Sequence, residues 1–207
     1  MNRLMTLGRL GCVASVAVLV VACANRVYNP LDDYEEVAPA TALTVPQASL
    51  ENAPRAELAM IKRGQYLVEL LGCANCHTDG ALIGQPDAAR ALAGSNIGIA
   101  YSNPMQYESP GIVFPSNLTP DRETGIGDWT DIELMKMIRS GIDRHGHRKL
   151  SVMPWPAYSV ISDDDALAMT AYLRNLEPIN NRVPANVAPG QESSERYVHF
   201  GMYQSRQ

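Results

Sequence analysis

Residues 73–77 read Cys73-Ala74-Asn75-Cys76-His77, and this pentapeptide decides the fold. The pattern C-x-x-C-H is the attachment motif of c-type haem. Two thiols three residues apart can add to the two vinyl groups on one edge of a porphyrin. The adjacent imidazole then lies under the iron as an axial ligand. The sequence therefore predicts one covalently bound haem c, held by Cys73, Cys76 and His77.

Other uses of a cysteine pair fit this sequence less well. A thioredoxin-type redox pair is expected next to a βαβ pattern, and none is evident here. A structural zinc site needs a second pair of ligands, and His145 and His147 form too isolated a pair to supply it. A disulfide loop gives no reason for a histidine at position 77. Haem attachment therefore remains the favoured interpretation.

Local signals predict helices on both sides of an irregular loop. Apolar residues recur at helical spacing over residues 55–71, and Gly72 marks the end of that helix. Thr130 and Glu133 form a capping box for a second helix that ends at Gly141. Ser162 caps a terminal helix whose first turn is acidic. Residues 78–116, rich in Gly and Pro, form an irregular loop with room for a short hairpin.

The second axial position of the iron decides between electron transfer and the handling of small ligands. Met153 is the favoured ligand, because it lies in a Pro-stiffened stretch, residues 151–156, between two predicted helices. On the other side, the far nitrogen of His77 is expected to donate to a backbone carbonyl in the loop 78–116, with Pro86 as our choice. Several other methionines lie in predicted helices, where packing is the usual role: Met60, Met135, Met137 and Met169.

Four further stretches carry a resemblance to a known family: Asn117–Asp121, Thr124–Trp129, Met153–Pro156 and Ala171–Arg174. Over about residues 60–180 the chain resembles a single haem domain of the cytochrome c subunits of membrane-associated bacterial alcohol and aldehyde dehydrogenases. The resemblance implies an all-α, class I cytochrome c fold, with three to five helices around one haem and long irregular loops. It also implies His77 and Met153 as the axial pair, and a crossing of the first and last helices at Gly64. The family's subunits typically carry several such domains, whereas this chain has one C-x-x-C-H motif.

Three more side chains are candidates for contact with the haem or its propionates: Trp129, Trp155 and Arg139. Ordinary core or surface packing explains each of them equally well. A cluster of basic residues extends from the second predicted helix to the Met153 stretch and consists of Lys136, Arg139, Arg144, Arg148 and Lys149. It is either a docking surface for an acidic redox partner or a solvated loop.

The N-terminus indicates export. Arg3 and Arg9 precede an apolar run that ends at Ala22, which is typical of a signal peptide. The run closes on Val20-Val21-Ala22-Cys23, which resembles the bacterial lipobox and predicts a lipidated Cys23; an ordinary signal peptide is the alternative. By resemblance to the sorting rules of such lipoproteins, Ala24 favours the outer membrane. The four cysteines are then accounted for without a disulfide, since Cys12 is removed with the signal.

The predicted organisation is a signal peptide at 1–22, a flexible tether at 23–54, a cytochrome c domain at 55–180 and a C-terminal tail at 181–207. The tether contains four prolines and an acidic patch, although packing along the domain is an equal alternative, with Tyr28, Leu31 and Tyr34 as anchors. The 207 residues include only two Phe and two Trp, so a haem would supply bulk that the core lacks. A net charge of −5 argues against nucleic acid as a partner.

Together these features predict a periplasmic, lipid-anchored, mono-haem cytochrome that carries single electrons and is not itself an enzyme. The expected partners are a dehydrogenase or quinol-oxidising complex on one side, and a terminal oxidase or reductase on the other. The alternative is a tightly bound electron-transfer subunit of such a complex. A haem sensor or a small catalytic haem protein would instead need an open axial position.

Overall fold

The computed structural model describes residues 43–51, 53–101, 111–147, 149 and 152–200. All of them belong to one compact unit, Glu35–Tyr203. The predicted signal peptide, Cys23 and the first part of the predicted tether lie outside the described residues. Within the described ranges, no helix has the length and apolar character needed to cross a bilayer.

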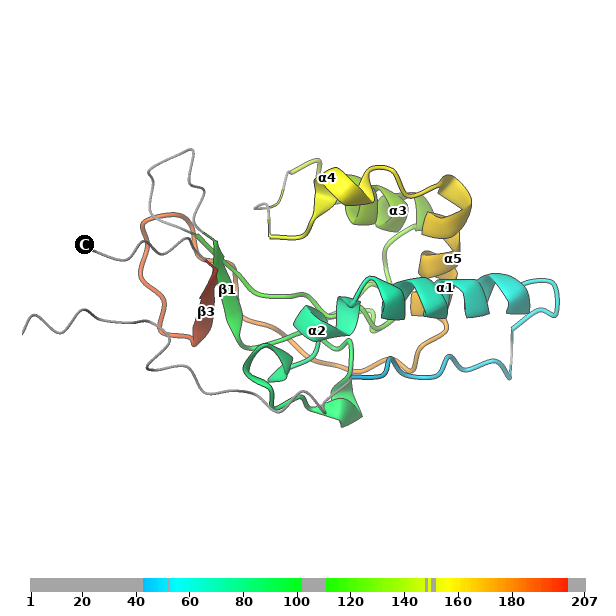
Figure 1. The fold of residues 1–207 in the computed structure, drawn as a ribbon, viewed down its shortest axis with the longest axis horizontal. Coiled ribbons are helices and arrows are strands. Elements are labelled where there is room, and N and C mark those ends of the chain that lie inside the picture. The colour runs from blue at the N-terminus through cyan, green and yellow to red at the C-terminus, as the bar shows by residue number, and fades with distance from the viewer. Residues whose placement is uncertain (1–42, 52, 102–110, 148, 150–151, 201–207) are drawn as a thin grey trace, which may run out of the picture. The chain divides into compact units, whose positions relative to one another are not determined.

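The described residues form five α-helices and a small sheet (Figure 1). The helices are α1 (Leu58–Leu70), α2 (Cys73–His77), α3 (Asp131–Ser140), α4 (Trp155–Tyr158) and α5 (Asp163–Arg174). Two short 3-10 turns, η1 (Ala81–Ile83) and η2 (Ala88–Arg90), follow α2. The predictions of three longer helices are confirmed, with ends that differ by a few residues.

Helix α1 crosses α5 at Gly64, as predicted. A Cβ atom on Gly64 would overlap the carbonyl oxygen of Ala168 and would lie 2.8 Å from the Cβ of Tyr172. The two helix backbones therefore approach so closely that only glycine fits. Around this crossing lies the main core, which includes Ile61, Val68, Leu92, Leu134, Met169, Tyr172 and Leu173.

The predicted caps of α3 and α5 are present. The Thr130 hydroxyl accepts the N–H of Glu133 (3.3 Å), and the Glu133 carboxylate accepts the N–H of Thr130 (2.7 Å). Gly141 ends α3 with a positive φ of 65°, which glycine adopts at little cost. The Ser162 hydroxyl accepts the N–H of Asp165 at the start of α5 (3.1 Å).

The all-α prediction is incomplete, because the chain also forms a sheet with the order β2-β1-β3. Strand β1 (Gly98–Tyr101) pairs antiparallel with β2 (Gly111–Val113), which confirms the hairpin in the loop 78–116. Strand β3 (Tyr197–Phe200) pairs parallel with β1, with Gly98 opposite Tyr197. Strands this short carry little signal of their own, and their pairing joins residues far apart in sequence.

Both predicted extensions of the domain pack onto it. In the predicted tail, Val183 and Val187 lie against an apolar cluster of Ala100, Ile112 and Phe114. In the predicted tether, residues 43–51 lie against the main core, where Val45 is 5% exposed. The Tyr172 hydroxyl donates to the carbonyl of Pro46 (2.6 Å), and Ser49 N–H donates to the carbonyl of Asn175 (2.7 Å). Residues 43–51 therefore pack along the domain, whereas the expected anchors Tyr28, Leu31 and Tyr34 lie outside the described residues.

Candidate haem-binding site

The single turn of α2 presents the two cysteines and the histidine of the C-x-x-C-H motif. Gly72, with a φ of 67°, breaks the backbone between α1 and α2. Cys73 and Cys76 are half-buried free thiols, and their i, i+3 spacing on a helix places them on one face. Burial raises the pKa of Cys73 to about 11 and also raises the pKa of Cys76, so both sulfurs carry their protons at neutral pH.

His77 is buried and oriented by one hydrogen bond. Its Nδ1 lies 2.7 Å from the carbonyl oxygen of Ser116. A carbonyl has no proton to give, so Nδ1–H is the donor. Burial lowers the pKa of His77, which favours the neutral ring, and in a neutral ring with a proton on Nδ1 the lone pair is on Nε2. This is the form in which histidine binds a metal. The acceptor is Ser116, which confirms a carbonyl of the loop 78–116, whereas the choice of Pro86 is wrong.

The loop after Ser116 is held by a buried amide. Asn117 is 2% exposed. Its side-chain oxygen accepts the N–H (2.9 Å) and the hydroxyl (2.7 Å) of Thr119. Its amide group donates to the carbonyl of Ile179 (2.7 Å) and to the Thr124 hydroxyl (3.1 Å). Asn117 thus ties the start of the 117–129 stretch to the chain after α5, and it fixes the carbonyl that His77 needs. The sequence marked this stretch as a motif but did not show its structural role.

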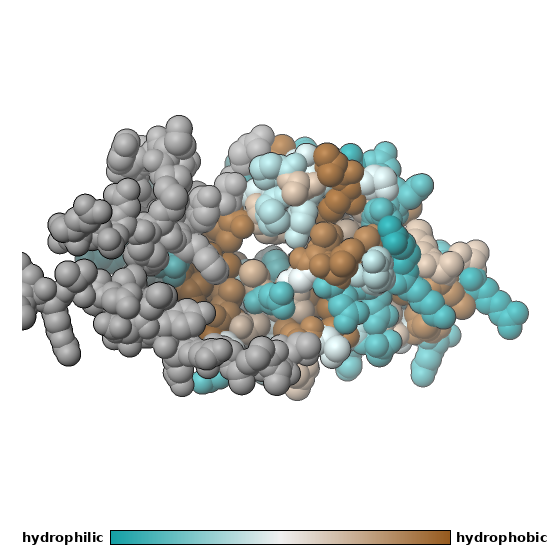
Figure 2. Space-filling model, viewed as in Figure 1, coloured by the Kyte–Doolittle hydropathy of each residue, from teal (hydrophilic) through white to brown (hydrophobic). Residues whose placement is uncertain are grey.

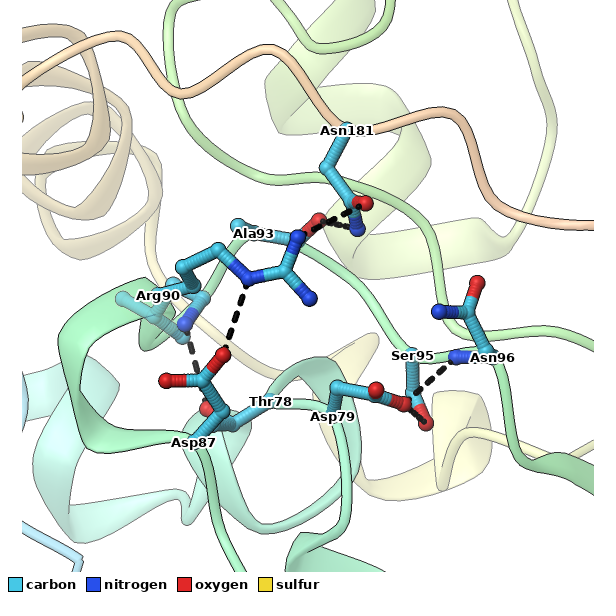
Figure 3. A network of polar contacts seen from close by, with 9 residues as sticks. Thr78, Asp79, Asp87, Arg90, Ala93, Ser95, Asn96 and Asn181 are labelled. Carbon is cyan, nitrogen blue, oxygen red and sulfur yellow. Dashed lines mark hydrogen bonds and ion pairs between the residues drawn. The ribbon is translucent and has the colours of Figure 1, made fainter.

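A second polar network secures the chain directly after His77 (Figure 3). The Thr78 hydroxyl accepts the N–H of Leu92 (3.1 Å), and the N–H of Gly94 donates to the carbonyl of His77 (2.9 Å). Asp79 accepts the N–H of Asn96 (2.7 Å). Outside these contacts, Arg90 pairs with Asp87, and Asn181 donates to the carbonyl of Ala93 (2.8 Å). Nothing in the local sequence pattern singled out these residues, because most of their partners are distant in sequence; the pair of Arg90 with Asp87, three residues apart, is the exception.

Helix α4 lies close to the cysteines at its C-terminal end. The Tyr158 hydroxyl donates to the carbonyl of Leu71, two residues before Cys73 (3.4 Å). Burial, with smaller effects from the nearby Cys73 and Cys76, raises the pKa of Tyr158 to about 12. The space-filling view shows the molecule hollowed between α4 and α2 (Figure 2).

Met153 is half-buried in a bend just before α4. The N–H of Trp155 donates to its carbonyl (2.8 Å). Trp155 is 8% exposed, and its indole Nε1 is buried without a hydrogen-bond partner among the described residues. A buried indole N–H without a partner is uncommon, so it indicates an acceptor that the described residues do not provide. That Met153 ligates iron stays a prediction.

The other two candidates for haem contact, Arg139 and Trp129, differ from Trp155 because they already contact other residues of the protein. The Arg139 guanidinium forms an ion pair with Asp163, so its charge is already compensated at the start of α5. Trp129 packs partly against the main core, and the Arg144 guanidinium lies 5.8 Å from its ring centre. In the basic cluster, Lys149 also has an acidic partner, Asp143 (2.8 Å). Arg148 lies outside the described residues. Two of the cluster's charges are therefore paired with carboxylates.

These donors fit a covalent haem. Cys73 and Cys76 supply two free thiols on one helical turn, and His77 supplies an imidazole with its Nε2 lone pair available. The indole N–H of Trp155, for which the described residues offer no acceptor, suits a carboxylate such as a propionate.

Comparison with known proteins supports this assignment. No protein-family model matches the chain. It is 32% identical to the cytochrome c subunit of alcohol dehydrogenase (quinone) from Gluconobacter oxydans, over 77% of this chain and 31% of that subunit. It is 35% identical to the gluconate 2-dehydrogenase cytochrome c subunit of Pantoea cypripedii, over 55% of this chain and 22% of the relative. It is 33% identical to the fructose dehydrogenase cytochrome subunit of Gluconobacter japonicus, over 62% of this chain and 24% of the relative.

The chain therefore resembles the cytochrome c subunits of bacterial dehydrogenases, as its motifs predicted. It spans about a third or less of the length of these relatives.

Proposed function

We propose that this chain is a mono-haem class I cytochrome c that carries single electrons. The observation that carries the proposal is the state of His77, whose Nδ1–H donates to Ser116 and whose Nε2 lone pair is left for a metal. It stands next to two free thiols on the same helical turn. The cytochrome c subunits to which the chain is similar support the same function.

Each residue of the site has a defined task in this proposal. Cys73 and Cys76 would hold the haem covalently, each through a thioether formed by addition of its S–H across a vinyl group. His77 and Met153 act as the two axial ligands, and Trp155 donates to a propionate. A bound haem supplies an iron that gains or loses one electron at a time. With both axial positions held by side chains, no substrate reaches the metal, so the chain acts as a carrier.

The proposed electron donor is a periplasmic dehydrogenase, because the similar proteins are cytochrome subunits of alcohol, gluconate and fructose dehydrogenases. A quinol-oxidising complex is the second candidate donor, and a terminal oxidase or reductase is the proposed acceptor. The chain works either as a shuttle or as a bound subunit. Co-purification at physiological salt separates the two, because a bound subunit elutes with its enzyme.

The proposed location is the periplasm, where an acylated Cys23 anchors the domain to the outer membrane. The support is the charged and apolar pattern of residues 1–22 and the lipobox-like end at Cys23. Membrane fractionation tests this location: Cys23→Ala should move the haem protein from the membrane to the soluble periplasmic fraction. If the wild-type protein is itself soluble, the anchor is absent.

The central experiment measures haem attachment and ligation in the protein exported by cells that make c-type cytochromes. We expect one haem per chain that survives denaturation, and its loss in Cys73→Ser/Cys76→Ser. Met153→Leu should keep the haem but abolish the Met–iron charge-transfer band in the near infrared. Met137→Leu, a half-buried methionine in α3, is the matched control and should keep the band. A band that survives Met153→Leu would contradict the axial assignment.

A further inference from the structure

The loop between α3 and Met153 encloses a carboxylate that the proposed function does not use. The side chain of Asp143 is 8% exposed and lies 2.8 Å from the Lys149 ammonium. Its Oδ1 also accepts the backbone N–H groups of His145 and His147 (2.9 Å each). The His147 ring is more distant, 3.8 Å from Oδ2, and mostly exposed. These hydrogen bonds and the ion pair join Asp143 to His145, His147 and Lys149, and they restrain the described part of the loop.

The loop closes on Gly141, the residue that ends α3. The N–H of Lys149 donates to the carbonyl of Gly141 (2.9 Å). Inside the loop, the N–H of Asp143 donates to the carbonyl of His147 (3.0 Å), and the N–H of Gly146 donates to the carbonyl of Asp143 (2.9 Å). The Asp143–Lys149 pair therefore fastens the far end of the loop to its beginning.

Gly141 also contacts the side chain of Trp155. A Cβ atom on Gly141 would lie 2.5 Å from Cζ2 of the indole, so the ring packs directly on the glycine backbone. Trp155 in turn is joined to Met153 by the hydrogen bond from its N–H to the Met153 carbonyl (2.8 Å). A continuous set of contacts thus runs from Asp143 and Lys149 through Gly141 and Trp155 to Met153.

We propose that Asp143, through its ion pair with Lys149, is a positioning residue that holds Met153 in place as an iron ligand. This inference rests on the proposed function, in which Met153 is the axial ligand. An exposed ion pair contributes little to stability, but removal of the partner of a buried carboxylate leaves an uncompensated charge. Loss of the ion pair therefore weakens the attachment of Lys149 to Gly141, and with it the packing of Trp155 on Gly141.

Competition with imidazole tests the proposal on the haem-loaded protein. Added imidazole replaces the methionine ligand, and the loss of the Met–iron band measures how firmly Met153 is held. We expect Asp143→Asn and Lys149→Met to lower the half-displacing imidazole concentration about tenfold, since each breaks a charge-assisted hydrogen bond. Lys149→Arg keeps the pair and should restore the wild-type value.

Asp165→Asn is the matched control. It removes a carboxylate that pairs with Arg63 (2.9 Å) between α1 and α5, away from the loop. It should leave imidazole displacement unchanged, even if the melting temperature falls slightly. The melting temperature, measured alongside, separates a general loss of stability from a loosened ligand.

The outcomes are distinct. If Asp143→Asn does not fold, Lys149→Met decides the question, because it leaves the backbone hydrogen bonds of Asp143 intact. A half-displacing concentration equal to that of Asp165→Asn overturns the positioning role and leaves the proposed function standing. A wild-type protein without covalent haem or without the Met–iron band overturns the proposed function, and this inference with it.

Discussion

The His77 side and the Met153 side of the site are built in different ways. His77 is 9% exposed and donates to a carbonyl whose loop is fixed by the fully engaged amide of Asn117. Met153 is half-buried and depends on a loop that is held by an ion pair, a glycine contact and a helix cap. If the two residues are the iron ligands, as proposed, this difference predicts that His77 is the fixed ligand and that Met153 is the one more easily exchanged.

The largest expected effect is on the helix crossing that supports the His77 side. Gly64→Ala places a methyl group against the Ala168 backbone and should cost about 3 kcal/mol or more of unfolding free energy, because two helices must separate. Denaturant unfolding followed by circular dichroism measures this cost. Gly146→Ala is the control, since no atom lies within 4 Å of its Cβ position and only its φ of +82° is strained. Equal costs for the two variants would contradict close packing at Gly64.

The next effect concerns the loop that orients His77. Asn117→Ala should cost about 2–4 kcal/mol, because it leaves the N–H of Thr119 without its acceptor in a buried site and removes the stronger of the two donors to the carbonyl of Ile179. The same unfolding measurement applies. The exposed Asn96 provides the comparison, and Asn96→Ala should change stability by less than about 0.5 kcal/mol. A mild effect of Asn117→Ala would mean that the loop is held by its other contacts.

On the Met153 side, acid should remove the contribution of Asp143. The hydrogen bond from Lys149, helped by the N–H groups of His147 and His145, lowers the pKa of Asp143 to about 2. A lowered pKa in the folded state stabilises the protein above the ordinary value near 3.8, and this stabilisation is lost as the pH falls through about 2. Asp143→Asn should therefore be less stable than wild type by about 1–2 kcal/mol at pH 6, with a gap that closes between pH 4 and pH 2. A gap independent of pH would contradict the ion pair.

The smallest expected effect is at the N-terminus of α3. Thr130→Ala should cost about 1 kcal/mol, because the N–H of Glu133 loses its acceptor. Thr130→Ser keeps the hydroxyl and should stay close to wild type in the same unfolding experiment. If Ser and Ala destabilise equally, the cap does not operate through this hydrogen bond.

Local patterns were sufficient to predict the three longer helices, with ends that differ by a few residues, but not the short helix α4, which begins at Trp155 inside the stretch expected to be a Pro-stiffened loop. The Thr130 and Glu133 capping box, the Ser162 cap and the glycine at position 72 each act within one turn, so the chain near them carries the whole signal. The same holds for the C-x-x-C-H motif on α2. The acceptor for His77 was wrongly predicted, because Ser116 is distant in sequence and any carbonyl of the loop looks alike to pattern analysis.

The sequence alone determined the chemistry that the chain can offer: two thiols and an imidazole on one turn, with a methionine directly before two closely spaced prolines further along. Short-range spacing is enough for that, because these groups share one helical turn or one stiff segment. Only the tertiary structure decided the extent of the domain, since residues 43–51 and strand β3 join it through non-local contacts. The tertiary structure also decided the packing of Trp155 on Gly141 and the burial of Asp143, because burial depends on packing between distant segments.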